Sequence, residues 1–186
     1  MLAQIVNFSV REQALPVFAD ALLRDRDGAR NEEVGFLEMR VFEDITDATK
    51  LWAYEVIADQ AALEQHRTKD YTKEVGRVAQ EALTTAPTFY RLTDPRHAET
   101  LMVGQGAITI IESAEADDLV DAITSLVSTH ADNLRFDVHR DQACDARIIT
   151  YELWDSISAA RAFGAALRTS LGAQAHITRT LLREMP

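Results

Sequence analysis

The sequence predicts an α+β fold built from two tandem repeats of one small unit. Three observations predict it: the two halves of the chain share a residue pattern, each half reads as β-α-β-β-α-β, and its strands are apolar on both faces. With 186 residues, of which 47% are hydrophobic, the chain can bury one medium core or two small ones. We expect one repeat at residues 1–92, a linker at 93–103 and a second repeat at 104–186.

The repeat appears when two stretches are aligned at a single offset of 97 residues. Residues 37–44, a turn and residues 51–55 align with residues 134–141, a turn and residues 148–152. The pairing holds across the turn without a gap, which makes coincidence a poor explanation. The matched pairs are Leu37 and Leu134, Val41 and Val138, Asp44 and Asp141, Tyr54 and Tyr151, and Glu55 and Glu152.

The first repeat opens with an alternating strand over residues 4–10. A helix follows from about Gln13, because Leu15, Phe18 and Leu22 share one face and Pro16 is tolerated only near a helix start. The remaining elements are strands at 36–43 and 50–57, a second helix after the N-cap residue Asp59, and a short strand at 88–92.

The second repeat has the same elements in the same order. They are strands at 107–112, 133–140, 147–153 and 177–182, a helix whose buried face carries Leu119, Ile123, Leu126 and Val127, and a helix that begins after Asp155 or Ser156. This order is the ferredoxin-like pattern.

Strand residues of both parities are apolar, as in residues 51–57. A sheet that is apolar on both faces must be covered on both. Two helices cover one face, and the sheet of the other repeat is the simplest cover for the second. We therefore expect an intramolecular pseudo-dimer, a dimeric α+β barrel within one chain. A further homodimer stays open.

Composition and charge exclude several classes of protein. The net charge is −11 without a basic patch, so neither nucleic acid nor an anionic membrane is an expected partner. No apolar run has the roughly 20 residues needed to cross a bilayer, and the N-terminus lacks the pattern of an export signal. A cytoplasmic protein is expected. The single cysteine, Cys144, is interpreted as a spectator thiol.

His66 is the most informative residue. It lies on the apolar stripe of the second helix, three residues after Leu63, and the offset of 97 aligns it with Phe163. His66 is either a satisfied core histidine or a catalytic group. The apolar counterpart means that the fold itself needs no polar group here, and an unpartnered one would cost about 1–3 kcal/mol. Asp70, one turn later, either orients the imidazole or is solvated.

Asn7 interrupts an otherwise apolar strand, where asparagine is disfavoured. Its amide could position a substrate oxygen or bind backbone or water, and Ile111 is its expected counterpart. Trp52 and Tyr54 share one strand face, and Tyr71 follows His66 on the helix. These aromatic residues are either core or the walls of an apolar pocket for a flat aromatic or small carbonyl substrate.

No sequence motif for a phosphate loop, a dinucleotide, a flavin or a metal is present, so we expect no cofactor and no metal. His97, His130, His139 and His176 are interpreted as surface residues.

The motifs from Gly35 to Val41, Trp52-Ala-Tyr-Glu55 and Asp59 to His66 resemble the antibiotic biosynthesis monooxygenase (ABM) superfamily. The resemblance is to its branch of quinol monooxygenases and the enzyme that processes phosphorylated autoinducer-2. It spans nearly all of residues 1–92, and for the fold it extends over 105–186.

The resemblance implies a ferredoxin-like dimer with a cavity between sheet and helices. It also implies oxygenation of quinols or anthrone-like polyphenols by molecular oxygen without metal or flavin. Asn7, Trp52, Tyr54 and His66 would line the cavity, with His66 as the base and Asn7 or Tyr54 stabilising the oxyanion. Tyr71 stands where members of this branch often carry a second histidine, and a haem ligand would fall near Gly76.

The leading hypothesis is a cofactor-independent monooxygenase, or a related isomerase, with one site in the first repeat. It would act on a small quinol, polyphenol or carbonyl compound. The alternatives are a non-catalytic small-molecule-binding or structural ABM-like protein, and haem handling.

Overall fold

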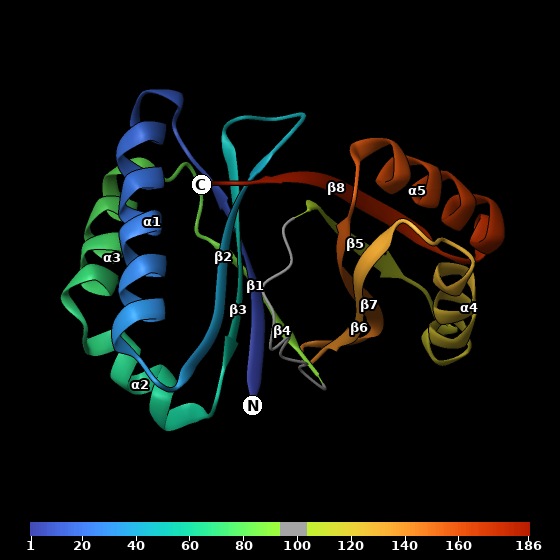
Figure 1. The fold of residues 1–186 in the computed structure, drawn as a ribbon, viewed down its shortest axis with the longest axis horizontal. Helices are drawn as coiled ribbons and strands as arrows, with labels where there is room; N and C mark the ends of the chain where they lie inside the picture. The colour runs from blue at the N-terminus through green and yellow to red at the C-terminus, as the bar shows by residue number, and fades with distance from the viewer. Residues whose placement is uncertain (94–103) are drawn as a thin grey trace. The chain divides into compact units, whose positions relative to one another are not determined.

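In a computed structural model, the chain folds into two copies of one α+β unit (Figure 1). The structure describes residues 1–93 and 104–186, apart from the side chain of Asp117. The predicted linker, residues 93–103, lies outside the described residues except for Thr93. The first unit contains β1 (Leu2–Ser9), α1 (Leu15–Glu32), β2 (Phe36–Asp44), β3 (Lys50–Ile57), α2 (Gln60–Thr68), α3 (Asp70–Ala82) and β4 (Thr88–Leu92). The second contains β5 (Gln105–Glu112), α4 (Ala116–Ser128), β6 (Asn133–Asp141), β7 (Cys144–Trp154), α5 (Ile157–Leu171) and β8 (His176–Glu184).

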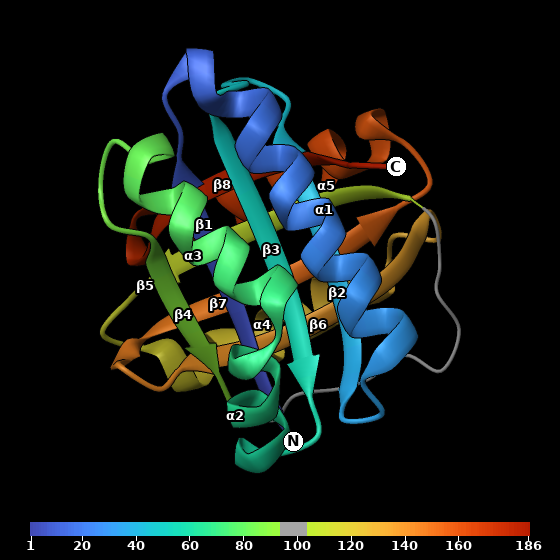
Figure 2. The same ribbon diagram turned by 90° about the vertical axis from the view of Figure 1, so that its left-hand side faces the viewer.

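Each unit has one antiparallel sheet with the strand order of a ferredoxin-like fold. In the first, β1 lies between β4 and β3, and β3 pairs with β2. In the second, β5 lies between β8 and β7, and β7 pairs with β6. Helices α1 and α3 cover one face of the first sheet (Figure 2). The predicted tandem ferredoxin-like repeats are confirmed.

Alternation along the strands decides which side chains meet the helices. On β3, Leu51, Ala53 and Ile57 pack into one cluster with Phe18 and Leu22 of α1. Trp52, Tyr54 and Val56 alternate with them and therefore point to the other face of the sheet. Both sets are buried, as the apolar pattern predicts.

The helix starts confirm the offset of 97 residues independently. Asp59 caps α2 by accepting a hydrogen bond from the Ala62 amide, and Ser156 caps α5 through the Ala159 amide. Such caps satisfy an otherwise unpaired N–H of the first turn. His66 and Phe163 are therefore structural counterparts.

The second helix of the first repeat differs from its expected form. The sequence predicts one continuous helix after Asp59, but α2 ends at Thr68 and α3 begins at Asp70, with Lys69 in an extended conformation between them. The corresponding helix in the second repeat, α5, runs unbroken to Leu171. This break repositions the side chains that follow His66.

The end of the chain belongs to the first unit, which includes Glu184–Pro186. The Met185 amide donates to the Val41 carbonyl, and the buried Arg26 donates to the carbonyls of Met185 and Pro186. The joint barrel of the two sheets stays a prediction.

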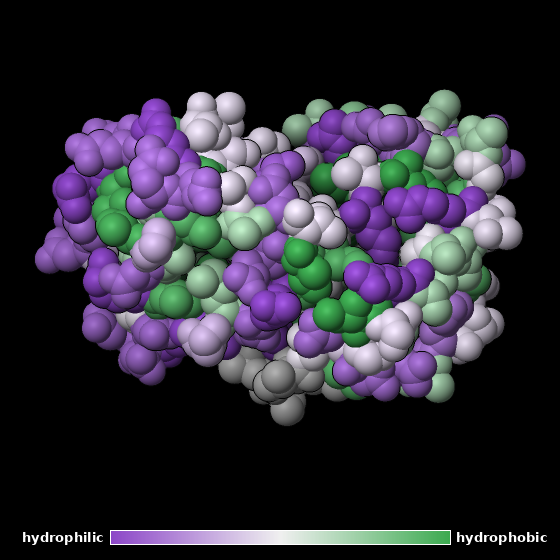
Figure 3. All heavy atoms as spheres, turned by 90° about the horizontal axis from the view of Figure 1, so that it is seen from above, coloured by the Kyte–Doolittle hydropathy of each residue, from purple (hydrophilic) through white to green (hydrophobic). Residues whose placement is uncertain are grey.

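Within the described ranges, no helix is both long enough and apolar enough to cross a membrane. Hydrophilic residues cover most of the surface over the helices of the first unit, on the left of Figure 3, with smaller hydrophobic patches between them. This surface agrees with the acidic composition.

Candidate functional site

His66 lies in the last turn of α2 and is only 4% exposed. Its ring packs against Phe36 of β2, with the two ring centroids 4.3 Å apart. The helix therefore holds the imidazole on the helix-covered side of the first sheet, where a buried polar group needs partners.

Glu33 is such a partner, and Tyr71 binds the same carboxylate. His66 Nδ1 lies 2.9 Å from Glu33 Oε1, and the Tyr71 hydroxyl donates to the same oxygen at 2.7 Å. Because a carboxylate only accepts, Nδ1 carries the proton in this arrangement and Nε2 is left with its lone pair. The Glu33–His66 pair thus fixes both the ring orientation and the tautomer.

The other side of the imidazole faces Asp25 of α1 and Thr72 of α3. Asp25 Oδ2 lies 3.7 Å from His66 Nε2, and the Thr72 hydroxyl donates to Asp25 Oδ1 at 2.7 Å. Thr72 Oγ1 is also 3.4 Å from Nε2. A basic nitrogen, a carboxyl group and a hydroxyl group therefore converge at one point between α1, α2 and α3.

Asp70 does not take part, which corrects the expectation that it lies beside His66. Counting one turn along a continuous helix places the two together, but the chain breaks at Lys69. Asp70 becomes the first residue of α3, where its side chain is fully exposed and 3.5 Å from Lys73 Nζ. The same break turns Tyr71 and Thr72 toward His66.

Gly28 of α1 makes room for Tyr71. A Cβ atom at Gly28 would lie 2.5–2.7 Å from carbon atoms of the Tyr71 ring. Such distances are far below van der Waals contact, so only glycine lets the ring pack against the helix at this point. The hydroxyl of Tyr71 reaches Glu33 through this gap.

Glu55 adds another buried carboxyl group on the helix-covered face of β3. It is 8% exposed, and Gln4 on the neighbouring strand donates to its Oε2 at 2.5 Å. Burial raises the pKa of Glu55, and Asp25 raises it further, against the lowering effects of the Gln4 hydrogen bond, His66 and Arg67.

The pKa of the Asp25 carboxyl group is shifted in the same direction as that of Glu55. Burial raises the pKa of Asp25, partly offset by the Thr72 hydrogen bond and by His66. Burial beside Glu33 also raises the pKa of Tyr71, which keeps the phenol protonated. Raised carboxyl pKa values next to a histidine are typical of sites that move protons.

In the described ranges, no three His, Cys, Asp or Glu side chains are arranged to hold a metal ion.

Asn7, Trp52 and Tyr54 lie together, but apart from His66. Asn7 pairs with Trp52 across β1 and β3, and its side-chain amide donates weakly to the Leu51 carbonyl at 3.4 Å. Their strand parity points them to the face opposite the helices, which corrects the expectation of one cavity with His66. The indole N–H of Trp52 is buried and has no hydrogen-bond partner in the part of the chain that the structure describes.

The sequence pattern therefore predicts His66 and Tyr71 at a common site but does not point to Asp25, Glu33, Glu55 and Thr72. Two of these leave a signal. Asp25 follows Leu22 by three residues, so it falls on the buried stripe of α1. Glu55 has the same strand parity as Ala53 and Ile57 and therefore lies on the core face of its strand. Thr72 leaves none, because its position depends on the break at Lys69.

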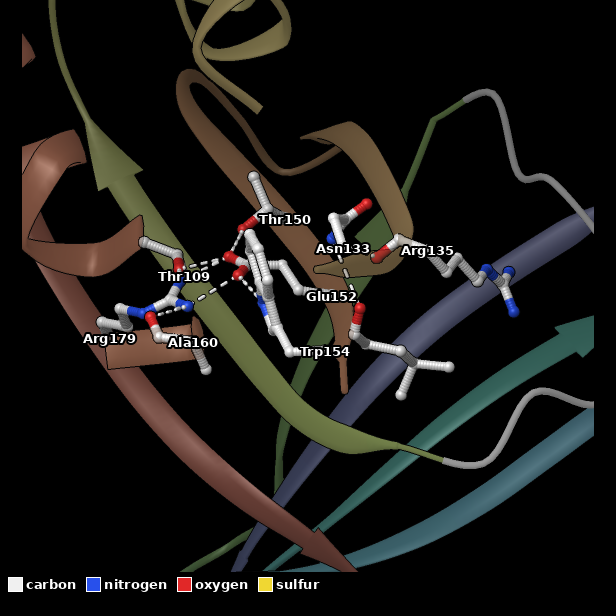
Figure 4. A network of polar contacts seen from close by, with 9 residues as sticks. Thr109, Asn133, Arg135, Thr150, Glu152, Trp154, Ala160 and Arg179 are labelled. Atoms are coloured by element: carbon white, nitrogen blue, oxygen red, sulfur yellow. Dashed lines mark hydrogen bonds and ion pairs between the residues drawn. The ribbon is translucent and has the colours of Figure 1, made fainter. Parts of the chain in front are cut away.

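The second repeat has a different polar centre at the corresponding place (Figure 4). Glu152, the counterpart of Glu55, is completely buried and forms a bidentate ion pair with Arg179. Arg179 Nη1 lies 2.5 Å from Glu152 Oε1, and Nη2 lies 2.7 Å from Oε2. Thr109, Thr150 and Trp154 also donate to its carboxylate. Phe163 fills the position of His66. The strand register also makes Ile110, and not Ile111, the counterpart of Asn7.

Gly164 makes room for the Arg179 side chain, as Gly28 does for the Tyr71 ring. A Cβ atom at Gly164 would lie 2.8 Å from Arg179 Cδ and Nε. The Arg179 guanidinium also lies 5.4 Å from the Phe163 ring centroid and donates to the Ala160 carbonyl at 3.0 Å. The second repeat therefore neutralises its buried carboxylate within the chain.

Solved structures of similar fold cover the whole chain. A putative monooxygenase from Fusobacterium nucleatum has a TM-score of 0.80 at 14% identity, over 100% of this chain and 92% of its own. A putative monooxygenase from Lactobacillus acidophilus has a TM-score of 0.76 at 12% identity, over 98% and 93%. An anthrone oxidase-like protein has a TM-score of 0.69 at 14% identity, over 100% and 91%. At these identities the likeness establishes the fold alone.

A family match is found for the first repeat. No curated protein matches the chain. The profile of the antibiotic biosynthesis monooxygenase family matches residues 1–77, a segment that includes β1 to β3, Asp25, Glu33, Glu55, His66 and Thr72. The resemblance carried by Gly35, Trp52 to Glu55 and His66 agrees with this match. The N-terminal repeat is thus an antibiotic biosynthesis monooxygenase domain.

Proposed function

We propose that the first repeat is a cofactor-independent monooxygenase that acts on a small phenol, quinol or acidic carbonyl compound with molecular oxygen. The observation that carries the proposal is the buried His66, whose Nδ1 binds Glu33, to which Tyr71 also donates, while Nε2 lies beside Thr72 and Asp25. The second repeat has Phe163 at this position, so the fold does not require the histidine.

The chemistry that suits this arrangement begins with proton removal. A neutral imidazole is the usual general base for a phenolic or α-carbonyl proton. Glu33 would stabilise the imidazolium that forms, as an oriented carboxylate does beside a catalytic histidine. The resulting anion is electron-rich enough to reduce oxygen directly, so that one oxygen atom enters the product and the other leaves as water.

The residues assigned to this activity differ in part from those of the sequence-based hypothesis. His66 and Tyr71 stay, Asp25, Glu33 and Thr72 join them, and Asp70 is dropped because it is fully exposed. Asn7, Trp52 and Tyr54 are assigned no contact with the base, since they lie on the other face of the sheet. The family match and the anthrone oxidase-like fold neighbour support the substrate class.

Oxygen uptake tests the proposal. The full chain is incubated with anthrone and with a hydroquinone, beside His66→Phe, which installs the residue of the second repeat. We expect the substitution to lower the rate by at least about 10²-fold. His176→Phe, at an exposed position of β8, is the matched control and should leave the rate unchanged.

Two outcomes would count against the proposal. Equal oxygen uptake by the wild type and His66→Phe removes the histidine from the reaction. Saturable binding of the substrates without oxygen uptake by the wild type favours a small-molecule-binding protein instead.

A further inference from the structure

The two repeats hold counterpart glutamates in opposite environments. By strand register, Thr109, Thr150 and Arg179 of the second repeat correspond to Val6, Ala53 and Phe89 of the first. The offset of 97 likewise makes Ile57 the counterpart of Trp154. Every side chain that donates to Glu152 is therefore replaced by an apolar one around Glu55.

Among the residues that the structure describes, Glu55 keeps one side-chain donor, the amide of Gln4. Glu152 by contrast receives two bonds from Arg179 and three from neutral donors, so its negative charge is fully compensated. A carboxylate buried with a single neutral donor is strongly destabilised relative to the neutral acid. The environment of Glu55 thus favours the protonated form.

The charged groups around Glu55 do not change this balance. Asp25 of α1 opposes ionisation, whereas His66 and the exposed Arg67 of α2 favour it, and burial has the largest effect. Tyr71 of α3 is a neutral phenol bonded to Glu33. On β4, Arg91 stands opposite Gln4, one strand further away, and is exposed.

We propose that Glu55 is a further catalytic residue of the first repeat: a neutral carboxyl group that donates a hydrogen bond to the substrate oxygen on which negative charge develops. This inference rests on the proposed function and narrows its substrate class. A site with a base at His66 and a separate acid at Glu55 suits a carbonyl compound with an acidic α-hydrogen, such as anthrone. In that class the proton leaves carbon while the charge moves to oxygen.

The reaction balances with oxygen as the only other reactant. His66 removes one α-proton and the carbonyl oxygen becomes an enolate, held by the Glu55 O–H group. The enolate carbon transfers electrons to oxygen and forms a C–O bond, and the proton on His66 converts the adduct into a hydroperoxide. Loss of the second α-hydrogen and cleavage of the O–O bond then release water, so the methylene group becomes a carbonyl group.

The first experiment measures protonation without any substrate. The side-chain carboxyl carbons of Glu55 and Glu152 are followed by NMR between about pH 4 and 9 in the full chain, with Glu55→Gln and Glu152→Gln to assign the signals. We expect Glu55 to be protonated at neutral pH and Glu152 to be ionised. An ionised Glu55 at neutral pH overturns the inference.

The second experiment measures proton removal without oxygen. Exchange of the anthrone methylene hydrogens with deuterium oxide is followed under anaerobic conditions, above the rate in buffer. Glu55→Val should lower the enzyme-dependent exchange rate by about 10²–10³-fold, which is the cost of removing one oxyanion donor. Glu55→Gln, whose amide can still donate, should stay within about tenfold of the wild type. Exchange by Glu55→Val at the wild-type rate overturns the inference, provided that its unfolding midpoint shows a folded chain.

The two failures are distinguishable. Exchange that depends on Glu55 but is not followed by oxygen uptake in air refutes the monooxygenase and leaves the role of Glu55 in place. Oxygen uptake with a hydroquinone by a protein that does not exchange anthrone keeps the monooxygenase and refutes the role of Glu55.

Discussion

Glu55 and His66 show that the polar chemistry of the first repeat depends on which side chains surround a buried group. Glu33, to which Tyr71 donates, binds one imidazole nitrogen, and Asp25 and Thr72 lie beside the other. The cluster contains more carboxyl groups than basic ones, so protons must make up the difference. The individual side chains are therefore expected to respond to pH.

Replacement of Glu55 by Gln tests the expected pH response at one residue. Because burial raises the pKa of Glu55 in the folded chain, the wild-type residue destabilises the fold once the pH exceeds its unfolded-state pKa. Glu55→Gln should raise the free energy of unfolding at pH 7 by on the order of 1–3 kcal/mol, a gain that fades as the pH falls toward about 4. Urea denaturation at several pH values measures it. A gain that is independent of pH would show that ionisation of the Glu55 carboxyl group is not its cause.

Tyr71→Phe removes one hydroxyl group and nothing else. The Glu33 carboxylate then loses a donor, so we expect a loss of about 1 kcal/mol in stability. The pH dependence of anthrone oxidation should also shift, since the carboxylate that pairs with His66 changes. Unchanged stability together with an unchanged pH profile would show that the hydroxyl does not support the histidine.

At this scale the sequence predicts little of the site. The offset of 97 residues singles out His66, because Phe163 stands in its place. The partners Glu33 and Thr72 come from other elements, and only their packing brings them near the imidazole. Asp70 is misplaced for the same reason, since a local break in a helix cannot be read from periodicity.

The break between α2 and α3 is the feature that separates the two repeats at the scale of elements. It lets α3 present Tyr71 to α1, at a crossing that Gly28 keeps open. Helix propensity alone would disfavour glycine in the middle of α1, so packing against the tyrosine ring explains it.

Gly28→Ala tests this crossing. The added methyl group would press against the Tyr71 ring, so we expect a loss of about 1–3 kcal/mol in stability and lower activity. Gly76→Ala in α3 is the matched control, since a Cβ atom there has nothing within 4 Å. It should stabilise the chain by about 0.5–1 kcal/mol. Stabilisation of both variants, measured by thermal denaturation, contradicts the proposed role of Gly28.

Most elements themselves are predictable from the sequence. The strands at 36–43, 50–57 and 88–92 match β2, β3 and β4 to within a residue, because apolar alternation and the flanking turn residues mark them. The N-caps Asp59 and Ser156 mark the helix starts equally well. The end of α2 is not predictable, since nothing in the periodic pattern before Lys69 interrupts the helix.

At the scale of the whole chain, the two repeats share one fold and divide its polar chemistry. The first repeat contains an uncompensated cluster around His66 and Glu55. The second contains Glu152 and Arg179, a compensated pair within its core (Figure 4). We interpret the second centre as structural, which predicts a large effect of its removal on folding.

Arg179→Met leaves Glu152 buried without its cation. Breaking a buried ion pair from one side costs about 3–5 kcal/mol, so we expect loss of stability on this scale. Arg168→Met, at an exposed position of α5, is the control and should change the stability by less than about 0.5 kcal/mol. If Arg179→Met is as stable as the control in denaturant titrations, the pair is not structural.

Isotopic oxygen shows most directly whether the first repeat is a monooxygenase that depends on His66. The full chain is incubated with anthrone under ¹⁸O₂, and the product is analysed by mass spectrometry beside the same reaction with His66→Phe. We expect one labelled oxygen atom in each product molecule, the other in water, and no labelling above buffer with His66→Phe. Unlabelled product, or equal labelling by the two proteins, would contradict this expectation.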